Sequence, residues 1–270
     1  MIDVHTHLHP PRLAAAIRRW FAERSPWKLE HSNDPHDVAS VLRAAGVERF
    51  VFCSYAHKTG IARELNAWLA QTSRELDGYG LPLATVHLDD PDYLEDLRIA
   101  FDDGCIGLKL HEDVQQLALD DPRLDLVYEL IARREGFVLA HVGPVPWSQD
   151  TRNGPQRLAS VLDRHPNVRF VVAHMGVPDT LAYFDFAQRY PNLFLDTTMA
   201  FASEDLRTNA QAADIERACN SIVFGTDYPN IPFPYDADKR IIDTLGLTPA
   251  ALTAIYAGNA RRLSPRLAAS

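Results

Sequence analysis

The segment Ile2–His9, which reads I-D-V-H-T-H-L-H, decides how the rest of the chain is interpreted. Successive side chains of a β-strand point to opposite faces, so Asp3, His5 and His7 are expected to share one face. Neutral imidazole is the commonest side-chain metal ligand, and two imidazoles at one strand end can converge on a single cation. An H-x-H pair alone is weak support for a metal site. Its weight therefore depends on the strand ends that follow.

Short apolar runs, rich in β-branched and aromatic residues, recur along the chain after this segment. They do not alternate with polar residues, which is typical of parallel strands that are covered on both faces. With the first segment they predict eight strands, and the seven that follow it are Arg49–Tyr55, Leu81–Leu88, Cys105–Leu110, Phe137–Val142, Val168–His174, Leu193–Thr198 and Ser221–Thr226.

Stretches with apolar residues at helical spacing lie between these runs, and several begin with proline or aspartate, as helix starts prefer. The alternation predicts an α/β fold, a single (β/α)8 TIM barrel that spans residues 1–270 as one domain. A doubly wound open sheet is the alternative, but its usual glycine-rich first turn is replaced here by histidines and prolines. The expected helices are Asp37–Ala45, Ile61–Leu76, Pro91–Phe101, Pro122–Arg134, Pro155–Arg164, Thr180–Tyr190 and Pro249–Leu263.

Two segments stand outside this alternation. Residues 10–34 are long for a connection and carry several aromatic side chains. They form either a helix with a lid over the barrel mouth or merely an extra packed helix, and both readings stay open. The tail Ser264–Ser270 is expected to be frayed.

The composition is that of an ordinary globular protein, with 46% hydrophobic and 23% charged residues in 270. The net charge of −9 argues against nucleic acid or an anionic membrane as a partner and leaves a small-molecule substrate. No apolar run approaches the roughly 20 residues that span a bilayer. Three widely spaced cysteines suit reduced thiols, which predicts a cytoplasmic protein. Assembly into a homo-oligomer stays open.

Polar residues stand at equivalent ends of different predicted strands, just before glycine or proline. In a barrel of this type, functional residues cluster where the carboxyl ends of the strands meet their loops. Neutral nitrogens with a carboxylate suit Zn2+, which lowers the pKa of a bound water to about 7 when a coordination position is open. The strand ends carry His5, His7, Lys109, His111, His141, His174 and Asp227, and the sequence therefore predicts a metal site at this end of the barrel.

The motifs I-D-V-H-T-H-L-H-P, A-H-V-G, A-H-M-G, F-G-T-D-Y-P and G-N-A-R-R-L in combination resemble the amidohydrolase superfamily. Within it, the chain is similar to the amidohydrolase-related branch of small barrels, from Ile2 to about Leu263. The resemblance implies that His5, His7 and His141 are metal ligands. It also implies that Asp227 both ligates metal and activates water.

Two further positions are left open by the resemblance. His174 matches a position that binds a second metal in two-metal members and acts as a catalytic histidine in one-metal members. Lys109 matches a position that some members use as a carboxylated lysine between two metals. It reads equally well as an ordinary lysine paired with an acid or with substrate. One or two zinc ions are therefore compatible with the sequence.

The expected activity is metal-dependent hydrolysis of a small ester, lactone or amide, with Asp227 and His174 as catalytic residues. The alternative on the same scaffold is decarboxylation of a small aromatic or unsaturated acid. Many decarboxylases of the branch begin with E-x-H, and His5 stands in that place here, which favours hydrolysis. A non-enzymatic ligand-binding barrel is the third reading. Expected substrate contacts are Lys109, Arg152 and Trp147, and other residues in loops at the mouth are Tyr55, His57, Phe201, Tyr228 and Asn230.

Overall fold

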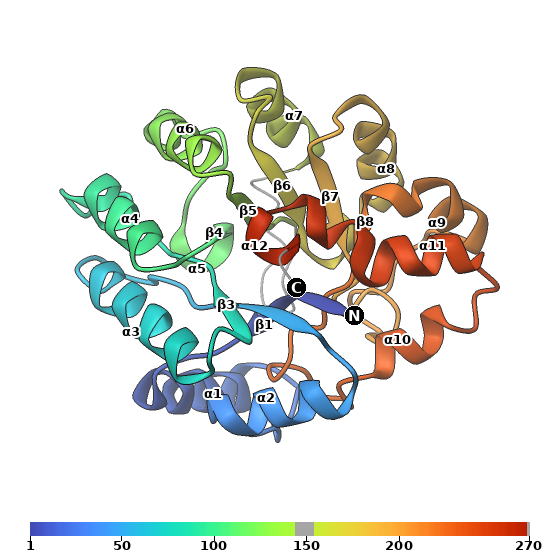
Figure 1. Cartoon of the computed structure of the whole chain (residues 1–270), viewed down its shortest axis with the longest axis horizontal. Coiled ribbons are helices and arrows are strands. Elements are labelled where there is room, and N and C mark those ends of the chain that lie inside the picture. Colours follow the sequence, from blue (N-terminus) through green and yellow to red (C-terminus); the bar gives the residue numbers. More distant parts are fainter. Residues whose placement is uncertain (144–153, 269–270) are drawn as a thin grey trace.

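The computed structural model describes residues 1–143 and 154–268. Parallel strands form the middle of the molecule, and helices surround them (Figure 1). The strands are shorter than the apolar runs that predict them. In chain order they are β1 (Ile2–His7), β2 (Arg49–Cys53), β3 (Gly80–Pro82), β4 (Gly107–His111), β5 (Phe137–His141), β6 (Arg169–Val172), β7 (Leu193–Asp196) and β8 (Ile222–Val223).

Neighbouring strands pair in parallel in the order β1-β2-β3 and, separately, β4-β5-β6-β7-β8. Backbone hydrogen bonds join the two groups at both edges. The amide of Val4 donates to the carbonyl of Phe224 at 2.9 Å, and the amide of Ile106 donates to the carbonyl of Pro82 at 2.9 Å. These bonds link β8 to β1 and β3 to β4, which confirms the predicted (β/α)8 arrangement.

Most helices lie where the helical spacing predicts them. Pro155–Arg164 agrees at both ends, and α2 is capped by the Asp34 side chain, which accepts the amides of His36 and Asp37. The α-helices are α1 (Pro11–Arg24), α2 (Pro35–Ala44), α3 (Ala62–Glu75), α4 (Tyr93–Asp102), α5 (Glu112–Gln115), α6 (Asp125–Arg133), α7 (Pro155–Arg164), α8 (Thr180–Arg189), α9 (Ala212–Ala218), α10 (Ala237–Ile242), α11 (Pro249–Thr253) and α12 (Pro265–Ala268). The shorter turns are η1 (Pro122–Leu124), η2 (Ala173–Gly176), η3 (Cys219–Ser221), η4 (Ala254–Gly258) and η5 (Ala260–Arg262).

The core consists of an inner cluster within the barrel and outer clusters between strands and helices. Alternation along β5 shows the division, because Phe137 and Leu139 belong to the inner cluster and Val138 and Ala140 to an outer one. The same alternation places His141 on the inner face, at the carboxyl end of the strand. Burial of both faces explains why the strands read as continuous apolar runs.

The tail is not frayed over its described part, contrary to the expectation for Ser264–Ser270. Residues Pro265–Ala268 form α12, which lies at the centre of the view in Figure 1. Leu267 is buried and belongs to the inner cluster with Ile2 and Val4. The tail is therefore ordered because it covers apolar side chains inside the barrel.

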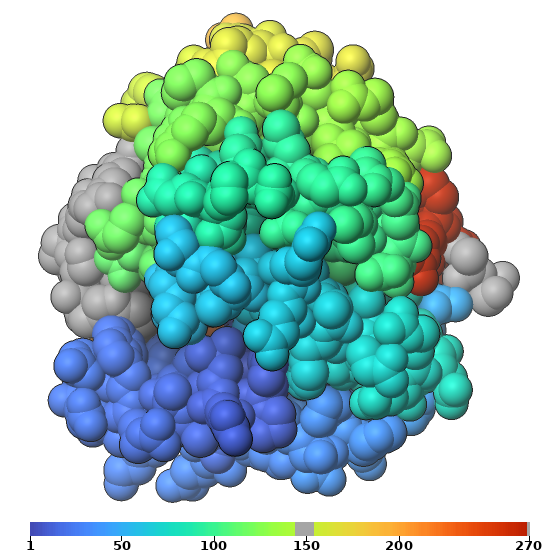
Figure 2. Space-filling view, turned by 90° about the vertical axis from the view of Figure 1, so that its left-hand side faces the viewer, coloured from blue at the N-terminus to red at the C-terminus, as the bar shows by residue number. Residues whose placement is uncertain are grey.

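The segment of residues 10–34 contains α1, which covers the opposite side of the barrel from α12. In the space-filling view, α1 is dark blue at the lower left and the red C-terminal residues lie at the right (Figure 2). The side chains of α1 line the cavity described below, so the segment is more than an extra packed helix. Within residues 1–143 and 154–268, no helix is long and apolar enough to cross a membrane.

Candidate functional site

A cavity of about 380 Å3 lies at the carboxyl ends of the strands. Its polar floor is a closed ring of histidines and one tyrosine from several strand ends, whose neighbouring ring centroids lie between 4.1 and 5.8 Å apart. This ring brings together residues that lie far apart in the sequence. Its members, in order around the ring, are His7, His5, His174, His141, His111 and Tyr55.

His5 is held by a buried carboxylate on one side and faces charged groups on the other. Its Nδ1 donates to Oδ2 of Asp196 at 2.8 Å, so the neutral ring keeps its lone pair on Nε2. That Nε2 lies 2.9 Å from Nζ of Lys109 and 3.1 Å from Oδ1 of Asp227. Burial, followed by the charge of Lys109, lowers the pKa of His5 to about 4. His5 is therefore neutral at pH 7, as a metal ligand has to be.

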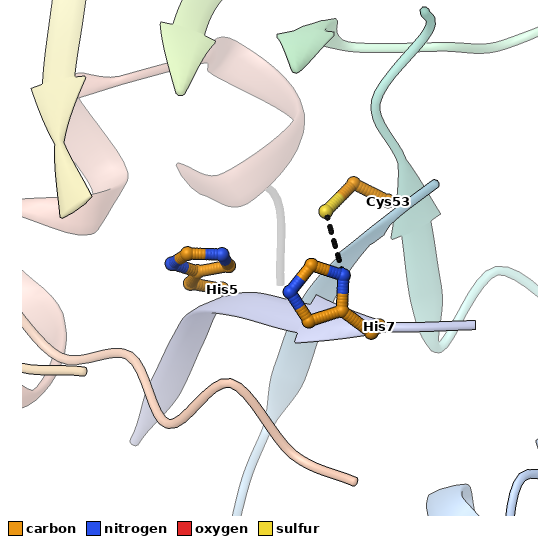
Figure 3. Close-up of side chains that lie close together, drawn as sticks. All are labelled: His5, His7 and Cys53. Atoms are coloured by element: carbon orange, nitrogen blue, oxygen red, sulfur yellow. Dashed lines mark hydrogen bonds between the residues drawn. The ribbon is translucent and has the colours of Figure 1, made fainter. Parts of the chain in front are cut away.

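His7 shares the carboxylate oxygen that His5 faces. Its Nε2 lies 2.7 Å from Oδ1 of Asp227, and its Nδ1 lies 3.4 Å from Sγ of Cys53 (Figure 3). Burial lowers the pKa of His7, but the neighbouring Cys53 sulfur and the negative charge of Asp227 outweigh burial and raise the pKa to about 10. At neutral pH the His7 ring therefore carries a proton on Nε2, between that nitrogen and Oδ1 of Asp227. A metal cation can take the place of that proton.

Two donor sets compete for a metal at β1. His5, His7 and Cys53 have ligand atoms within 4.8 Å of one another, and Asp227 faces the same two imidazoles. The Cys53 thiol lies at Nδ1 of His7, on the other side of the ring from the Nε2 that faces Asp227. Its S–H also donates to the carbonyl of Thr6 at 3.4 Å. In the donor set with Asp227, the metal would be bound by the Nε2 atoms of His5 and His7. Cys53 would then contact Nδ1 of His7 and position that ring.

His141 and His174 form a chain of hydrogen bonds that assigns a tautomer to both rings. Nδ1 of His174 donates to the carbonyl of Thr198 at 3.1 Å, so its Nε2 accepts a hydrogen bond from Nδ1 of His141 at 3.0 Å. Among the described residues, the buried Nε2 of His141 has no hydrogen-bond partner. Burial keeps the pKa of His141 well below its usual range. An unpaired, unprotonated nitrogen in the floor of a cavity fits a metal ligand.

Strained backbone marks the strand ends that carry these groups. His174 has a φ of 56° and Asp227 a φ of 65°, in the left-handed region that side chains other than glycine avoid. This turn at His174 ends β6 at Val172, two residues before the predicted end of the strand. A Cβ on Gly225 would lie 3.0 Å from Cβ of His5, so glycine is required there for the close approach of β8 to β1. Strain of this kind is concentrated at functional sites.

Asp227 is ionised in this arrangement. Burial raises its pKa, but the charges of His7 and then His5 outweigh burial and hold the pKa well below the usual range of a carboxyl. Lys109 is almost fully buried, and its Nζ also lies 5.9 Å from the centre of the Tyr55 ring. The site therefore combines the Asp227 carboxylate, the Lys109 ammonium, a protonated His7 and the neutral rings of His5 and His141.

The residues expected at the mouth divide into three groups. Tyr55, His57 and Asn230 line the cavity. Phe201 and Tyr228 are buried in hydrophobic clusters. Two expected substrate contacts, Trp147 and Arg152, lie outside the described residues, and their roles stay predictions.

Asp3 and His9 lie behind the ring rather than in the cavity. Asp3 accepts the amide of His5 at 3.1 Å and the hydroxyl of Thr226 at 2.7 Å, which ties β1 to the segment after β8. His9 pairs with Ser54 at 2.7 Å and accepts from Asn230 at 3.3 Å. Both residues are structural in this arrangement.

Sequence reasoning missed the contribution of Asp196 and Cys53 to the site, whereas His111 was expected among the strand ends at the mouth. Asp196 ends β7 and accepts the amides of His174 and Thr198 as well as the His5 ring. The sequence could have indicated Asp196, because the run L-F-L-D ends an apolar strand with a carboxylate. His111 stacks on His141 at 4.1 Å, and only the fold reveals this contact.

A parallel barrel with histidines and carboxylates gathered at the carboxyl ends of its strands defines a TIM-barrel enzyme class. Residues 2–265 match the family model described as Amidohydrolase, and the chain belongs to this family. Among curated proteins, none matches the chain.

Solved structures resemble the whole chain. An uncharacterized TIM-barrel protein from Bordetella bronchiseptica has 21% identity and a TM-score of 0.73, with 100% of each chain covered. A 5-carboxyvanillate decarboxylase from Novosphingobium aromaticivorans, complexed with manganese, has 15% identity and a TM-score of 0.71, covering 97% of this chain and 95% of that one. A probable 2-pyrone-4,6-dicarboxylic acid hydrolase from Acinetobacter baumannii has 13% identity and a TM-score of 0.65, covering 97% and 98%. At these identities the likeness shows the fold.

Proposed function

We propose that this protein is a metal-dependent hydrolase of a small ester, lactone or amide. The observation that carries the proposal is the position of Asp227, whose Oδ1 lies 3.1 Å and 2.7 Å from the Nε2 atoms of His5 and His7. Imidazoles bind a metal in their neutral form, and a carboxylate beside two of them can help to hold the metal and can accept a proton from water. Family membership supports this reading.

The proposed metal ligands are His5, His7, His141 and Asp227, with Zn2+ as the proposed ion. The donors fit a borderline divalent metal, because they are imidazole nitrogens and a carboxylate. The orphaned Nε2 of His141 and the shared oxygen of Asp227 support the assignment. The manganese in the Novosphingobium aromaticivorans relative supports a divalent ion but not zinc in particular.

When bound, such a metal supplies Lewis acidity and lowers the pKa of water at the site. Asp227, ionised at neutral pH, accepts the proton of the attacking water and passes it toward the leaving group. His174 lines the cavity beside His141 and is the second proposed proton-transfer residue. Lys109, with its buried ammonium in the floor of the cavity, would hold the substrate carbonyl or carboxylate.

Decarboxylation is the second candidate, because a specific observation favours it. Among the described lining residues Lys109 is the one permanent cation, and the side chains of α1 that line the same cavity are apolar. A carboxylate removed from water in such a cavity is a poorer ground state than its uncharged product CO2. The manganese-containing relative is also a decarboxylase by name. In this reading the metal holds the substrate and His174 moves the proton.

The test is product analysis with protein purified without chelator and loaded with Zn2+ or Mn2+. Esters, lactones and amides would be followed by acid release, and aromatic acids by CO2 release. Asp227→Asn is expected to lower kcat about 100- to 10,000-fold, as loss of a general base does. Acid release that survives this substitution would refute the hydrolase mechanism, whereas CO2 release without acid release would establish the second candidate. Elemental analysis of the same sample decides between one ion and two.

A further inference from the structure

One face of α1 forms an apolar wall of the cavity. Its lining side chains recur at positions i, i+3, i+4, i+7 and i+8, which is the spacing of one helix face. Ala15 and Ala22, on the opposite face, are exposed and do not line the cavity. The helix therefore presents its apolar stripe to the cavity, through Leu13, Ala16, Ile17, Trp20 and Phe21.

The wall continues beyond α1. Trp27 stacks on Phe21 with ring centroids 6.1 Å apart and an angle of 15° between the rings. Its indole N–H donates to Asp205 at 3.1 Å, which ties the wall to the segment after β7. Leu206 and Met199 of that segment line the same cavity. The hydrogen bond and the ring stacking hold the apolar side chains in place opposite the histidine ring.

The permanent charges of the described lining residues lie outside the α1 wall. Among the lining residues in the described part of the chain, Lys109 is the one permanent cation, and the carboxylates of Asp113 and Asp227 share the cavity with it. The Arg24 guanidinium lies 5.6 Å from the centre of the Trp20 ring, but it pairs with Glu23 at 3.0 Å and does not line the cavity. Against the α1 wall a carboxylate would therefore lose its hydration without meeting an unpaired cation among the described lining residues. The wall therefore disfavours a second anionic group on a ligand.

We propose that the cavity takes a substrate with a bulky uncharged apolar body, packed against α1, and a single polar reacting group at the histidine ring. The position of the reacting group at the histidine ring rests on the proposed function. The selection of an apolar body by the α1 wall does not depend on which reaction occurs. A cavity of about 380 Å3 is within the range of small-molecule sites. The proposal predicts discrimination against polyanionic acids.

The test compares two probes in the metal-loaded protein by isothermal titration calorimetry. 2-Naphthoate has one carboxylate and an apolar body, and naphthalene-2,6-dicarboxylate differs by one added carboxylate at the far end. We expect 2-naphthoate to bind at least about tenfold more tightly, because the added carboxylate is desolvated at the wall. Equal affinities, or no binding of 2-naphthoate, would overturn the proposal.

Matched variants locate the effect on α1. Ile17→Arg places a cation in the wall and is expected to abolish or invert the preference. Ala22→Arg adds the same charge to the exposed face of the same helix and is expected to leave the preference unchanged. If Ile17→Arg does not fold, as judged by circular dichroism, Phe21→Gln replaces it and is expected to weaken 2-naphthoate binding several-fold. Equal behaviour of the wall variant and Ala22→Arg would refute the assignment of selectivity to α1.

Binding and turnover separate this inference from the proposed function. A protein that hydrolyses no ester, lactone or amide but still prefers 2-naphthoate would overturn the proposed reaction and support the wall. A protein that hydrolyses esters but binds both probes equally would support the proposed reaction and overturn the selection by the wall.

Discussion

Asp196→Asn offers the sharpest test of how the site works. The Asp196 carboxylate is fully buried and accepts hydrogen bonds from Nδ1 of His5 at 2.8 Å, from the amide of His174 at 2.9 Å and from the amide of Thr198 at 3.1 Å. Asparagine keeps one oxygen for the two amides but presents an NH2 group to the His5 ring. The ring must then accept at Nδ1 and carry its proton on Nε2, where the lone pair for a metal is lost.

The size of the effect follows from one lost charge-assisted hydrogen bond. Such a bond contributes about 1.5–3 kcal/mol, and each 1.4 kcal/mol is a factor of ten in affinity. We therefore expect Asp196→Asn to weaken metal binding about 10- to 100-fold, the range found when carboxylate partners of metal-binding histidines are removed. The assay is competition for Zn2+ with a chromophoric chelator at pH 7.

Asp238→Asn is the matched control. Asp238 is also a buried carboxylate, and it accepts the amides of Met199, Phe201 and Ala202 but contacts no proposed ligand. We expect it to lower the free energy of unfolding by about 1–3 kcal/mol and to change metal affinity less than about threefold. Unchanged metal affinity in Asp196→Asn, or equal losses in both variants, would refute the reasoning.

Three further predictions concern the same end of the barrel. His141→Asn is expected to abolish metal binding, whereas His174→Asn is expected to keep the metal, measured by elemental analysis, and to lower kcat; loss of metal in both would make His174 a ligand. Gly225→Ala is expected to lower the free energy of unfolding by about 1–3 kcal/mol and to weaken metal binding. The reason is that the Cβ of the new alanine would lie 3.0 Å from Cβ of His5. An unchanged midpoint of urea unfolding would contradict this prediction. Burial, followed by the charge of His7, lowers the pKa of His9 from 6.5 to about 3, so the unfolded chain binds more protons between these values and stability falls as pH falls. The metal-free protein should therefore lose about 2 kcal/mol between pH 6.5 and 5 from this group, and urea titrations of His9→Asn should show a correspondingly shallower dependence on pH.

The order of strands and helices could be predicted from the sequence because it depends on local patterns. Apolar runs and helical spacing recur along the chain, and their alternation leaves few topologies other than a parallel barrel. The polar residues near the carboxyl ends were also readable, since His5 and His141 lie in β1 and β5 and Asp227 follows β8, but the exact ends of β3, β6 and β8 were predicted too late in the chain. That the chain is a single domain, and that it is cytoplasmic, stay predictions.

The partners of these residues could not be read from the sequence. Asp196 lies 191 positions from His5, and Cys53 lies 46 positions from His7. A pairing over such distances depends on strand register and on which ring nitrogen faces which neighbour, and neither leaves a local signal. The tail also escaped prediction, because Leu267 is ordered only by the apolar barrel interior that it covers.

The sequence by itself determined the fold, the family resemblance and the residues that reach the mouth of the barrel. Tertiary structure alone decided which atoms of those residues meet, because hydrogen bonds to Asp196 and Thr198 set the tautomers of His5 and His174, and His174 in turn sets that of His141. It also turned residues 10–34 from an unexplained connection into an apolar wall, since the apolar stripe of α1 lines the cavity only because the helix lies across it.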